Sequence, residues 1–336
     1  MTNPVTDPSE KPGVHFADLS PELVLDALDT VGVRGDGRLL ALNSYENRVY
    51  QVWREDAPPL VAKFYRPARW SDAQILEEHA FVASLVEREV PVVPALTLAG
   101  TTLNVHQGFR FSVFEKHGGR APELEQQGVL EWLGRFIGRI HAVGALQPFA
   151  LRPALDIDSF GIASRDYLLA HDFLPPELQA AYFSVVAQAL DGVRRCFDRA
   201  GATGSIRLHG DCHCGNVLWT DAGPHFVDFD DSRSGPAIQD LWMLLSGERT
   251  DQVRQMADLL AGYEDFMDFD ARELHLVEGL RTLRLLHYSA WLARRWDDPA
   301  FPLAFPWFNT QRYWQDRILE LREQVALMDE PPLWQN

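Results

Sequence analysis

Residues 208–231, LHGDCHCGNVLWTDAGPHFVDFDD, restrict the possible fold of this chain more than any other segment. Two apolar runs, GNVLW and HFVDF, flank a turn and together predict a β-hairpin. Asn216 stands near the start of the first run, and Asp228 stands near the end of the second. If the strands pair, both side chains lie at the same end of the hairpin, with Asp211 close by. The segment therefore predicts a cluster of oxygen-bearing side chains.

This cluster contains the residue types that phosphoryl transfer requires. A carboxylate such as Asp211 can orient an attacking hydroxyl and accept its proton, while further oxygen ligands hold Mg²⁺ on the phosphates of ATP. One carboxylate and one amide suit Mg²⁺ better than zinc. Asn216 and Asp228 are therefore the candidate magnesium ligands, and the chain is a candidate ATP-dependent kinase.

Phosphoryl transfer also needs a lysine on the phosphates, and Lys63 is the candidate because it is a single charge in the apolar strand PLVAKFY. Val61, Lys63 and Tyr65 are expected on one face of this strand, and Ala62 and Phe64 on the other. A carboxylate from the helix that follows is expected to orient the lysine.

That helix is predicted over residues 71–87, with Ser71 as its N-cap. Glu77 and Glu78 are both available to pair with Lys63, and Glu78 is favoured because it lies two helical turns before Leu85. Cofactor binding is therefore assigned to Glu78 while the choice between the two stays open. The apolar stripe of the helix is expected to comprise Ile75, Leu76, Phe81, Val82 and Leu85.

Cys212, His213 and Cys214 offer a competing interpretation of the same segment. Zinc sites usually space their cysteines C-x₂₋₄-C, whereas C-x-C in an extended loop directs the sulfurs apart, so reduced thiols are the favoured reading. A redox-sensitive thiol beside Asp211 is a separate hypothesis that rests on sequence adjacency. His209 is expected to hold the loop that carries Asp211.

The chain changes character along its length. Strands with a few helices are expected up to about residue 116, and mostly helices afterwards, with a lobe boundary near residues 115–122, EKHGGRAP. From Ile238 onward the helices are expected to be broken by Pro302 and Pro306. The predicted domains are a flexible tail at 1–14, a β-rich lobe at 15–116 and a helical lobe at 117–336.

The net charge of −17 bears on the possible partners. Such an acidic surface repels nucleic acid and anionic lipid, so neither is expected as a partner. Apolar runs stay below the roughly 20 residues of a membrane helix, and the N-terminal sequence is unlike a signal peptide, which leads us to expect a cytoplasmic protein. Arg294 and Arg295 are expected on a solvated face.

Several motifs together resemble the aminoglycoside-phosphotransferase and choline-kinase branch of the protein-kinase-like fold. The pattern HGDxHxxN followed by VDFDD, with VAKF upstream, is similar to the signature of that branch. Further segments resemble a group of bacterial stress-response kinases within it: LNSYENRVYQV, KFYRPARW, ILEEHAF, RLHGDCHCGN, GPAIQDLWMLL and WLARRWDDPAFP. The resemblance implies an α+β, bilobal protein-kinase-like fold with a small β-rich N-lobe, a larger helical C-lobe and the site between them.

The resemblance also implies roles for single residues. Asp211 would be the catalytic base, and Asp228 both a catalytic carboxylate and, with Asn216, a magnesium ligand. Lys63 would hold the phosphates of ATP, and Asp240 would brace the catalytic loop. The nucleotide would also be bound by Ser44, in the loop at residues 43–47, and by a hinge at residues 113–116 that includes Val113, Glu115 and Lys116.

Relatives in the stress-response group are described as serine/threonine protein kinases, so the expected partners are ATP and a protein with a Ser or Thr acceptor. Autophosphorylation is possible, and a monomer is expected. The glycine loop GxGxxG of protein kinases is absent from the strand region, which weakens any inference about phosphate geometry. A small-molecule kinase acting on an amino alcohol, a sugar or an aminoglycoside stays open as an alternative, followed by a nucleotide-binding pseudokinase.

Overall fold

The computed structural model describes residues 15–333, so the tail predicted at residues 1–14 lies outside the described residues. Contacts divide the chain into two compact units. The first comprises the residues up to His79 together with Val93–His117, and the second comprises Ala80–Val92 and the residues from Gly118 onward. This division falls inside helix α2, Asp72–Val86. The domain boundary expected at residue 116 stays a prediction.

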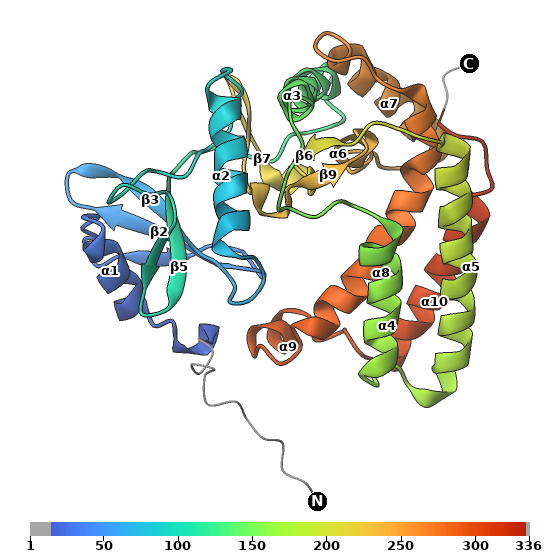
Figure 1. Cartoon of the computed structure of the whole chain (residues 1–336), viewed down its shortest axis with the longest axis horizontal. Helices are drawn as coiled ribbons and strands as arrows, with labels where there is room; N and C mark the ends of the chain where they lie inside the picture. The colour runs from blue at the N-terminus through green and yellow to red at the C-terminus, as the bar shows by residue number, and fades with distance from the viewer. Residues whose placement is uncertain (1–14, 334–336) are drawn as a thin grey trace, which may run out of the picture. The chain divides into compact units, whose positions relative to one another are not determined.

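The first unit is built on an antiparallel sheet, which within residues 15–333 has five strands in the order β1-β2-β3-β5-β4 (Figure 1). Helix α1, Pro21–Thr30, begins at the N-cap Ser20, whose hydroxyl accepts from the Leu23 amide. The core contains residues from α1 and the sheet, among them Leu28 and Phe64. The strands are β1 Leu39–Ala41, β2 Arg48–Arg54, β3 Ala57–Phe64, β4 Asn104–His106 and β5 Phe109–Glu115.

Strand β3 alternates as its sequence predicts. Ala62 and Phe64 are fully buried in the sheet core, whereas Tyr65, just beyond the strand, packs in a separate cluster with Ile75. Lys63, on the same side as Tyr65, is only 8% exposed. A charged side chain at this depth needs partners.

Helix α2 begins as predicted, because the Ser71 hydroxyl accepts from the Gln74 amide at 3.2 Å. The Gln74 side chain accepts from the Ser71 amide in return, which completes a capping box. Ile75 is buried, but Leu76 is 42% exposed, so its placement in the apolar stripe is wrong. Leu76 follows Ile75 by about 100° around the helix, which carries it off the buried face.

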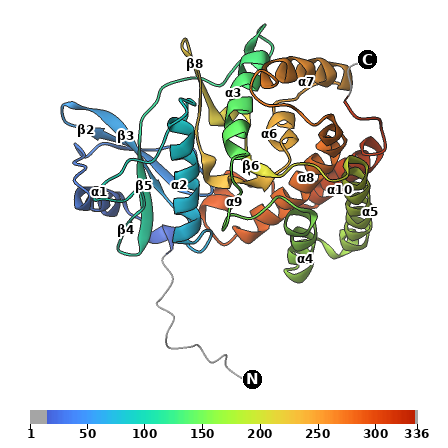
Figure 2. The same ribbon diagram turned by 45° about the horizontal axis from the view of Figure 1, so that its top comes forward.

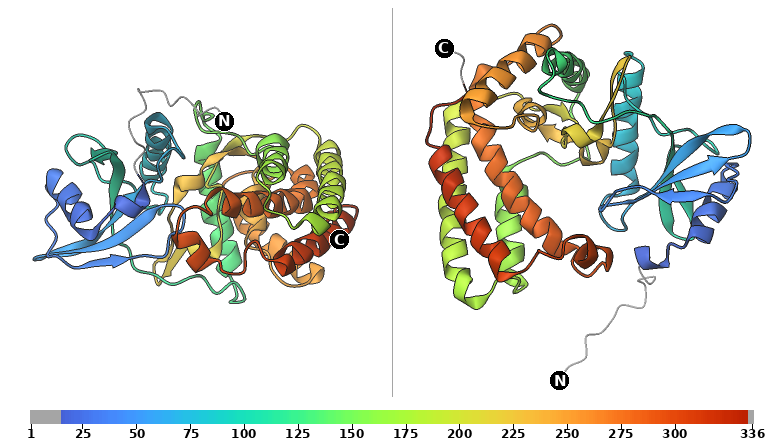
Figure 3. Two further views of the ribbon diagram at one scale, coloured as in Figure 1. Left: turned by 90° about the horizontal axis from the view of Figure 1, so that it is seen from below. Right: turned by 180° about the vertical axis from the view of Figure 1, so that it is seen from behind.

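The second unit is mainly helical, and α5 and α8 pack against each other and against α10 (Figure 3). Across residues 15–333, no helix combines the length and hydrophobicity needed to cross a membrane. Pro302 does not break a helix: it lies in the first turn of α9, where a proline costs no hydrogen bond. The helices are α3 Val129–Gly144, α4 Ala163–Ala170, α5 Pro176–Ala200, α6 Ile238–Trp242, α7 Arg249–Tyr263, α8 Val277–Arg294, α9 Ala300–Ala304 and α10 Gln311–Leu327.

The predicted hairpin is confirmed: β7, Val217–Thr220, pairs antiparallel with β8, Gly223–Phe226. A second pairing, between β6 at Ile206–Leu208 and β9 at Arg233–Gly235, was not predicted. Each of these strands has only three residues, too few to show a period of two. The β6–β9 pairing places the residues before the Asp211 loop beside those after Asp228.

Candidate active site

The loop that carries Asp211 is held in place through hydrogen bonds from its backbone amides. Asp240, at the start of α6, accepts from the His209 amide at 2.7 Å and from the Gly210 amide at 2.9 Å. Asp240 is buried and also lies 3.1 Å from Nε2 of His141. Gly210 has a φ of +87°, and a Cβ there would approach the Asp231 carbonyl oxygen to 2.1 Å. These contacts support the bracing role expected for Asp240.

His209 holds the loop from a second side, as expected. Its ring is fully buried, and Nε2 lies 2.9 Å from the carbonyl oxygen of Val227, next to Asp228. Nδ1 is 3.3 Å from the Asp211 amide. His209 therefore ties the Asp211 loop to the end of the hairpin.

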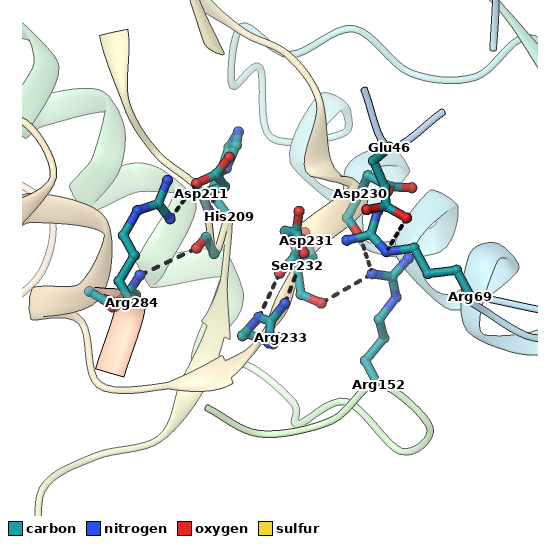
Figure 4. A network of polar contacts seen from close by, with 12 residues as sticks. Glu46, Arg69, Arg152, His209, Asp211, Asp230, Asp231, Ser232, Arg233 and Arg284 are labelled. Carbon is teal, nitrogen blue, oxygen red and sulfur yellow. Dashed lines mark hydrogen bonds and ion pairs between the residues drawn. The ribbon is translucent and has the colours of Figure 1, made fainter. Parts of the chain in front are cut away.

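The Asp211 carboxylate is flanked by two basic side chains. Nη1 of Arg284, on α8, donates to Oδ1 at 2.8 Å (Figure 4). Nε2 of His213 lies 3.4 Å from Oδ2. Burial alone would raise the pKa of the Asp211 carboxyl, but His213 and Arg284 oppose it, and the net effect holds the pKa below its usual value. Asp211 is therefore ionised at neutral pH and able to accept a hydrogen bond from an acceptor hydroxyl.

At one end of the hairpin, the backbone next to Asp228 pairs with the backbone of Asn216. The Val227 amide donates to the Asn216 carbonyl oxygen at 3.0 Å, next to the pairing of Val217 with Phe226. Nδ2 of Asn216 donates to the backbone oxygen of Asp211 at 2.9 Å. That bond uses the amide nitrogen and leaves Oδ1 of Asn216 as the end of the side chain that can ligate a cation. An amide oxygen beside a carboxylate suits Mg²⁺, so the residues fit the predicted ion.

The segment after Asp228 is held by buried arginines. Nη1 of Arg152 donates to the backbone oxygens of Asp230 and Ser232 at 2.6 and 3.2 Å. Arg233 pairs with the Asp231 carboxylate at 2.9 Å (Figure 4). Backbone contacts with charged donors fix this turn, and with it the position of Asp228.

In the first unit, Lys63 lies near a buried polar chain. Its Nζ is 5.5 Å from the centre of the Tyr65 ring, and the Tyr65 hydroxyl is 2.8 Å from Nε2 of His79. Glu78 is 5% exposed, whereas Glu77 is partly exposed. The burial of Glu78 favours it over Glu77 as a partner of a buried lysine, and the pairing itself stays a prediction.

The loop between β1 and β2 carries Ser44 and is held by arginines rather than shaped by glycines. Arg66 donates to the backbone oxygens of Glu46 and Tyr45 at 2.9 and 3.0 Å. Its amide also donates to the Asn47 side chain at 3.1 Å. Glu46 is paired with Arg66 at 3.1 Å, so the loop has a defined path without the GxGxxG pattern.

The expected hinge residues differ in their surroundings. Val113 lies inside β5, is fully buried, and its carbonyl oxygen accepts from the Leu96 amide at 2.7 Å. Glu115 ends the strand and Lys116 follows it, both exposed. Glu115 and Lys116 are therefore better placed than the Val113 carbonyl to offer backbone groups to a ligand.

The cysteines of the Asp211 loop are poor ligands and poor nucleophiles. Burial, with the nearby charges of Asp240 and Asp211, raises the pKa of the Cys212 thiol well above its usual value. Burial also raises the pKa of Cys214. Thiolates bind zinc and react with peroxide, so two protonated thiols disfavour both alternative interpretations of the segment. Residues 15–333 hold no cluster of three or more His, Cys, Asp or Glu arranged to bind a metal.

The sequence does not mark Arg284, Arg152 or His141 as residues of the site. Arg284 is 73 positions from Asp211 and reads as one polar residue of an amphipathic helix, so no local signal marks it. Arg152 and His141 are polar residues that the fold buries. A buried position is visible only after the elements have packed.

The fold and the Asp211 cluster can now be compared with known proteins. Residues 38–277 match the model of the phosphotransferase enzyme family, known as APH. The chain therefore belongs to this family of phosphotransferases. It is 46% identical to stress response kinase A of Salmonella choleraesuis, over 95% of this chain and 96% of that protein. It is 45% identical to a Salmonella typhimurium protein named serine/threonine protein kinase RdoA, with the same coverage.

Solved structures agree on the fold. A microcompartment-associated aminopropanol kinase has a TM-score of 0.70 at 18% identity, covering 92% of this chain and 97% of its own. Amicoumacin kinase hAmiN, solved with AMP-PNP, Ca²⁺ and Ami, has a TM-score of 0.69 at 20% identity, covering 89% and 90%. The predicted α+β protein-kinase-like fold and the resemblance to bacterial stress-response kinases are both confirmed.

Proposed function

We propose that this phosphotransferase transfers the γ-phosphoryl group of ATP, with Mg²⁺, to Ser or Thr hydroxyls of proteins. The observation that carries the proposal is the position of the Asp211 carboxylate. Asp240 holds its loop, and the backbone oxygen of Asp211 accepts a 2.9 Å hydrogen bond from the side chain of Asn216. The 45% identity to a protein named serine/threonine protein kinase supports a protein acceptor. A cytoplasmic monomer that is able to autophosphorylate belongs to the same proposal.

The residues have distinct roles in this proposal. Asp211 orients the acceptor hydroxyl and takes its proton as the bond from the hydroxyl oxygen to the γ-phosphorus forms and the bond from the γ-phosphorus to ADP breaks, so that ADP leaves. Asn216 and Asp228 hold Mg²⁺, which neutralises charge on the phosphates. Lys63 binds the phosphates, with Glu78 as its partner. The adenosine end of ATP is assigned to Ser44, Val113, Glu115 and Lys116.

The test uses labelled ATP with the purified chain and a set of Ser and Thr peptides. Asp211→Asn removes the proton acceptor and is expected to lower the transfer rate by about 10²–10⁴-fold. Asp221→Asn, in the exposed turn of the hairpin, is the matched control and is expected to behave as wild type. Transfer by Asp211→Asn at the wild-type rate would refute the assignment.

A small-molecule kinase is the second candidate, because the aminopropanol and amicoumacin kinases share the fold. The two functions differ in where the label goes. Label on the chain itself or on Ser and Thr peptides favours the protein kinase. Turnover confined to an amino alcohol, a sugar or an aminoglycoside favours the small-molecule kinase.

A further inference from the structure

Arg284 meets Asp211 where an acceptor hydroxyl must approach. Its Nη1 donates to Oδ1 of Asp211 at 2.8 Å, yet 43% of the arginine side chain is exposed. A guanidinium has five N–H donors. Arg284 can therefore hold Asp211 and still offer donors to an anion on a bound acceptor.

The second carboxylate near Asp211, that of Asp231, has a cationic partner of its own. Asp231 is paired with Arg233 at 2.9 Å, and Arg233 is 8% exposed. The Arg233 guanidinium also stacks on Phe160, 4.6 Å from the ring centre, and Phe160 stacks on His287 at 4.3 Å. Asp231 is thus paired with a buried arginine, while its own side chain is 34% exposed.

Past Arg284, helix α8 carries one more arginine, Arg294, and Arg295 follows its end. Residues 277–298 contain four arginines, one glutamate and two aspartates, in a chain whose net charge is −17. Arg284, His287, Trp291 and Arg295 are spaced to lie on one face of the helix. Arg294 was expected on a solvated face, but it is partly buried, with its guanidinium 4.8 Å from the centre of the Tyr167 ring.

We propose that Arg284 is a specificity residue that selects acceptors with negative charge next to the reacting hydroxyl, as in an acidic Ser- or Thr-containing segment of a protein. This inference rests on the proposed function and names the substrate class of the same site. An acidic side chain beside the hydroxyl pairs with the outer N–H donors of Arg284, which brings the hydroxyl to Asp211. A lysine or an ammonium group in that position is repelled by the guanidinium.

The test compares three peptides that differ only in the residues flanking one serine, which are Asp, Ala or Lys. Binding is measured by fluorescence anisotropy, which needs no turnover, and transfer is measured with labelled ATP. We expect the wild type to bind the acidic peptide at least about 10-fold more tightly than the basic one, with the same order in kcat/KM. Arg284→Glu is expected to reverse the order, and Arg284→Gln to abolish it.

Arg312→Glu is the matched control, since it makes the same charge change on a side chain that is 89% exposed in α10. It is expected to keep the wild-type preference. Thermal melting identifies any Arg284 variant that fails to fold. In that case the proposal is decided by the relative affinities of the wild type for the three peptides. Equal or basic-preferring binding by the wild type would overturn the proposal, as would an equal loss on all three peptides in a folded Arg284→Glu variant.

Two other outcomes separate this inference from the proposed function. Acidic-peptide binding that Arg284→Glu reverses, without any phosphoryl transfer, would uphold the selection by Arg284 and refute the proposed protein kinase. Glycerol phosphate that is phosphorylated in place of every peptide would overturn the assignment to a protein segment. The first outcome tests whether Asp211 supports phosphoryl transfer to a peptide. The second tests whether the anion that Arg284 binds belongs to a peptide or to a small molecule.

Discussion

At the scale of the residue, Asp228 combines a proposed role as a magnesium ligand with an uncommon backbone conformation. Its φ of 62° and ψ of 59° lie in the left-handed region, which Asp and Asn tolerate better than most residues. The position therefore restricts the residue type before any ligand is considered. An alanine there would add backbone strain of roughly 1–2 kcal/mol. A loss of metal binding in that variant would then have two causes, the strain and the missing carboxylate.

Asp228→Asn is the cleaner variant, because asparagine keeps the backbone conformation and removes the charge. We expect it to lose Mg²⁺-dependent nucleotide binding while its melting temperature stays close to that of the wild type. Calorimetry with ADP, with and without Mg²⁺, measures this. Unchanged Mg²⁺-dependent binding by the variant would exclude Asp228 as a ligand.

Asp211 predicts a shift in the pH profile. Its pKa is held low by His213 and Arg284 against the effect of burial, so the wild type keeps an ionised base until the pH falls below the usual range of an aspartate. In Arg284→Met the burial remains and one opposing charge is lost. The acid limb of kcat is expected to move to higher pH, measured with a neutral peptide. An unmoved acid limb would separate Arg284 from the titration of Asp211.

At the scale of the element, glycines let α3 and α7 approach each other (Figure 2). A Cβ on Gly134 of α3 would lie 2.0 Å from the Leu259 carbonyl oxygen, and one on Gly262 of α7 would lie 1.9 Å from the Glu131 carbonyl oxygen. In both cases the obstacle is backbone, which no side-chain rotation relieves. These glycines are required by packing, although glycine lowers the intrinsic stability of a helix.

Gly134→Ala is therefore expected to destabilise the fold by about 1–3 kcal/mol or more, despite the better helix propensity of alanine. Gly204→Ala is the control, since a Cβ there has no neighbour within 4 Å. Urea unfolding measures both variants. A Gly134→Ala variant as stable as the wild type would mean that α3 and α7 can move apart without lowering the free energy of unfolding.

At the scale of the whole molecule, a buried acid links global stability to pH. Glu273 is 3% exposed and accepts from the Ile238 amide at 2.8 Å, at the start of the helix that carries Asp240. Burial raises the pKa of Glu273 to about 7. The unfolded chain releases this proton near the ordinary value of 4.5, so the folded state alone retains it at intermediate pH.

The stabilisation by the protonated form is therefore complete below the unfolded pKa and is lost as the pH rises through about 7. Its full size is up to about 3 kcal/mol. Glu273→Gln keeps an oxygen for the Ile238 amide and removes the titration, so its melting temperature is expected to gain on that of the wild type between pH 5 and pH 8. Glu87→Gln, with its side chain 75% exposed, is the control and should show no such gain.

Local sequence was enough for the features that depend on neighbouring residues. The cap at Ser71, the alternation along β3 and the β7–β8 hairpin follow from spacings of a few residues, and the structure confirms each of them. The five-residue interval between Asp211 and Asn216 likewise predicted a cluster that the hydrogen bond between them supports. Their chemical roles stay predictions.

Tertiary structure alone decided which distant residues meet. The β6–β9 pairing, the approach of Arg284 to Asp211, the close contact of α3 with α7 and the burial of Glu273 all join segments far apart in the chain. No local period carries such information, because the partner of a helix face depends on how every other element packs. That packing determines whether a polar side chain lies on the surface or in the site.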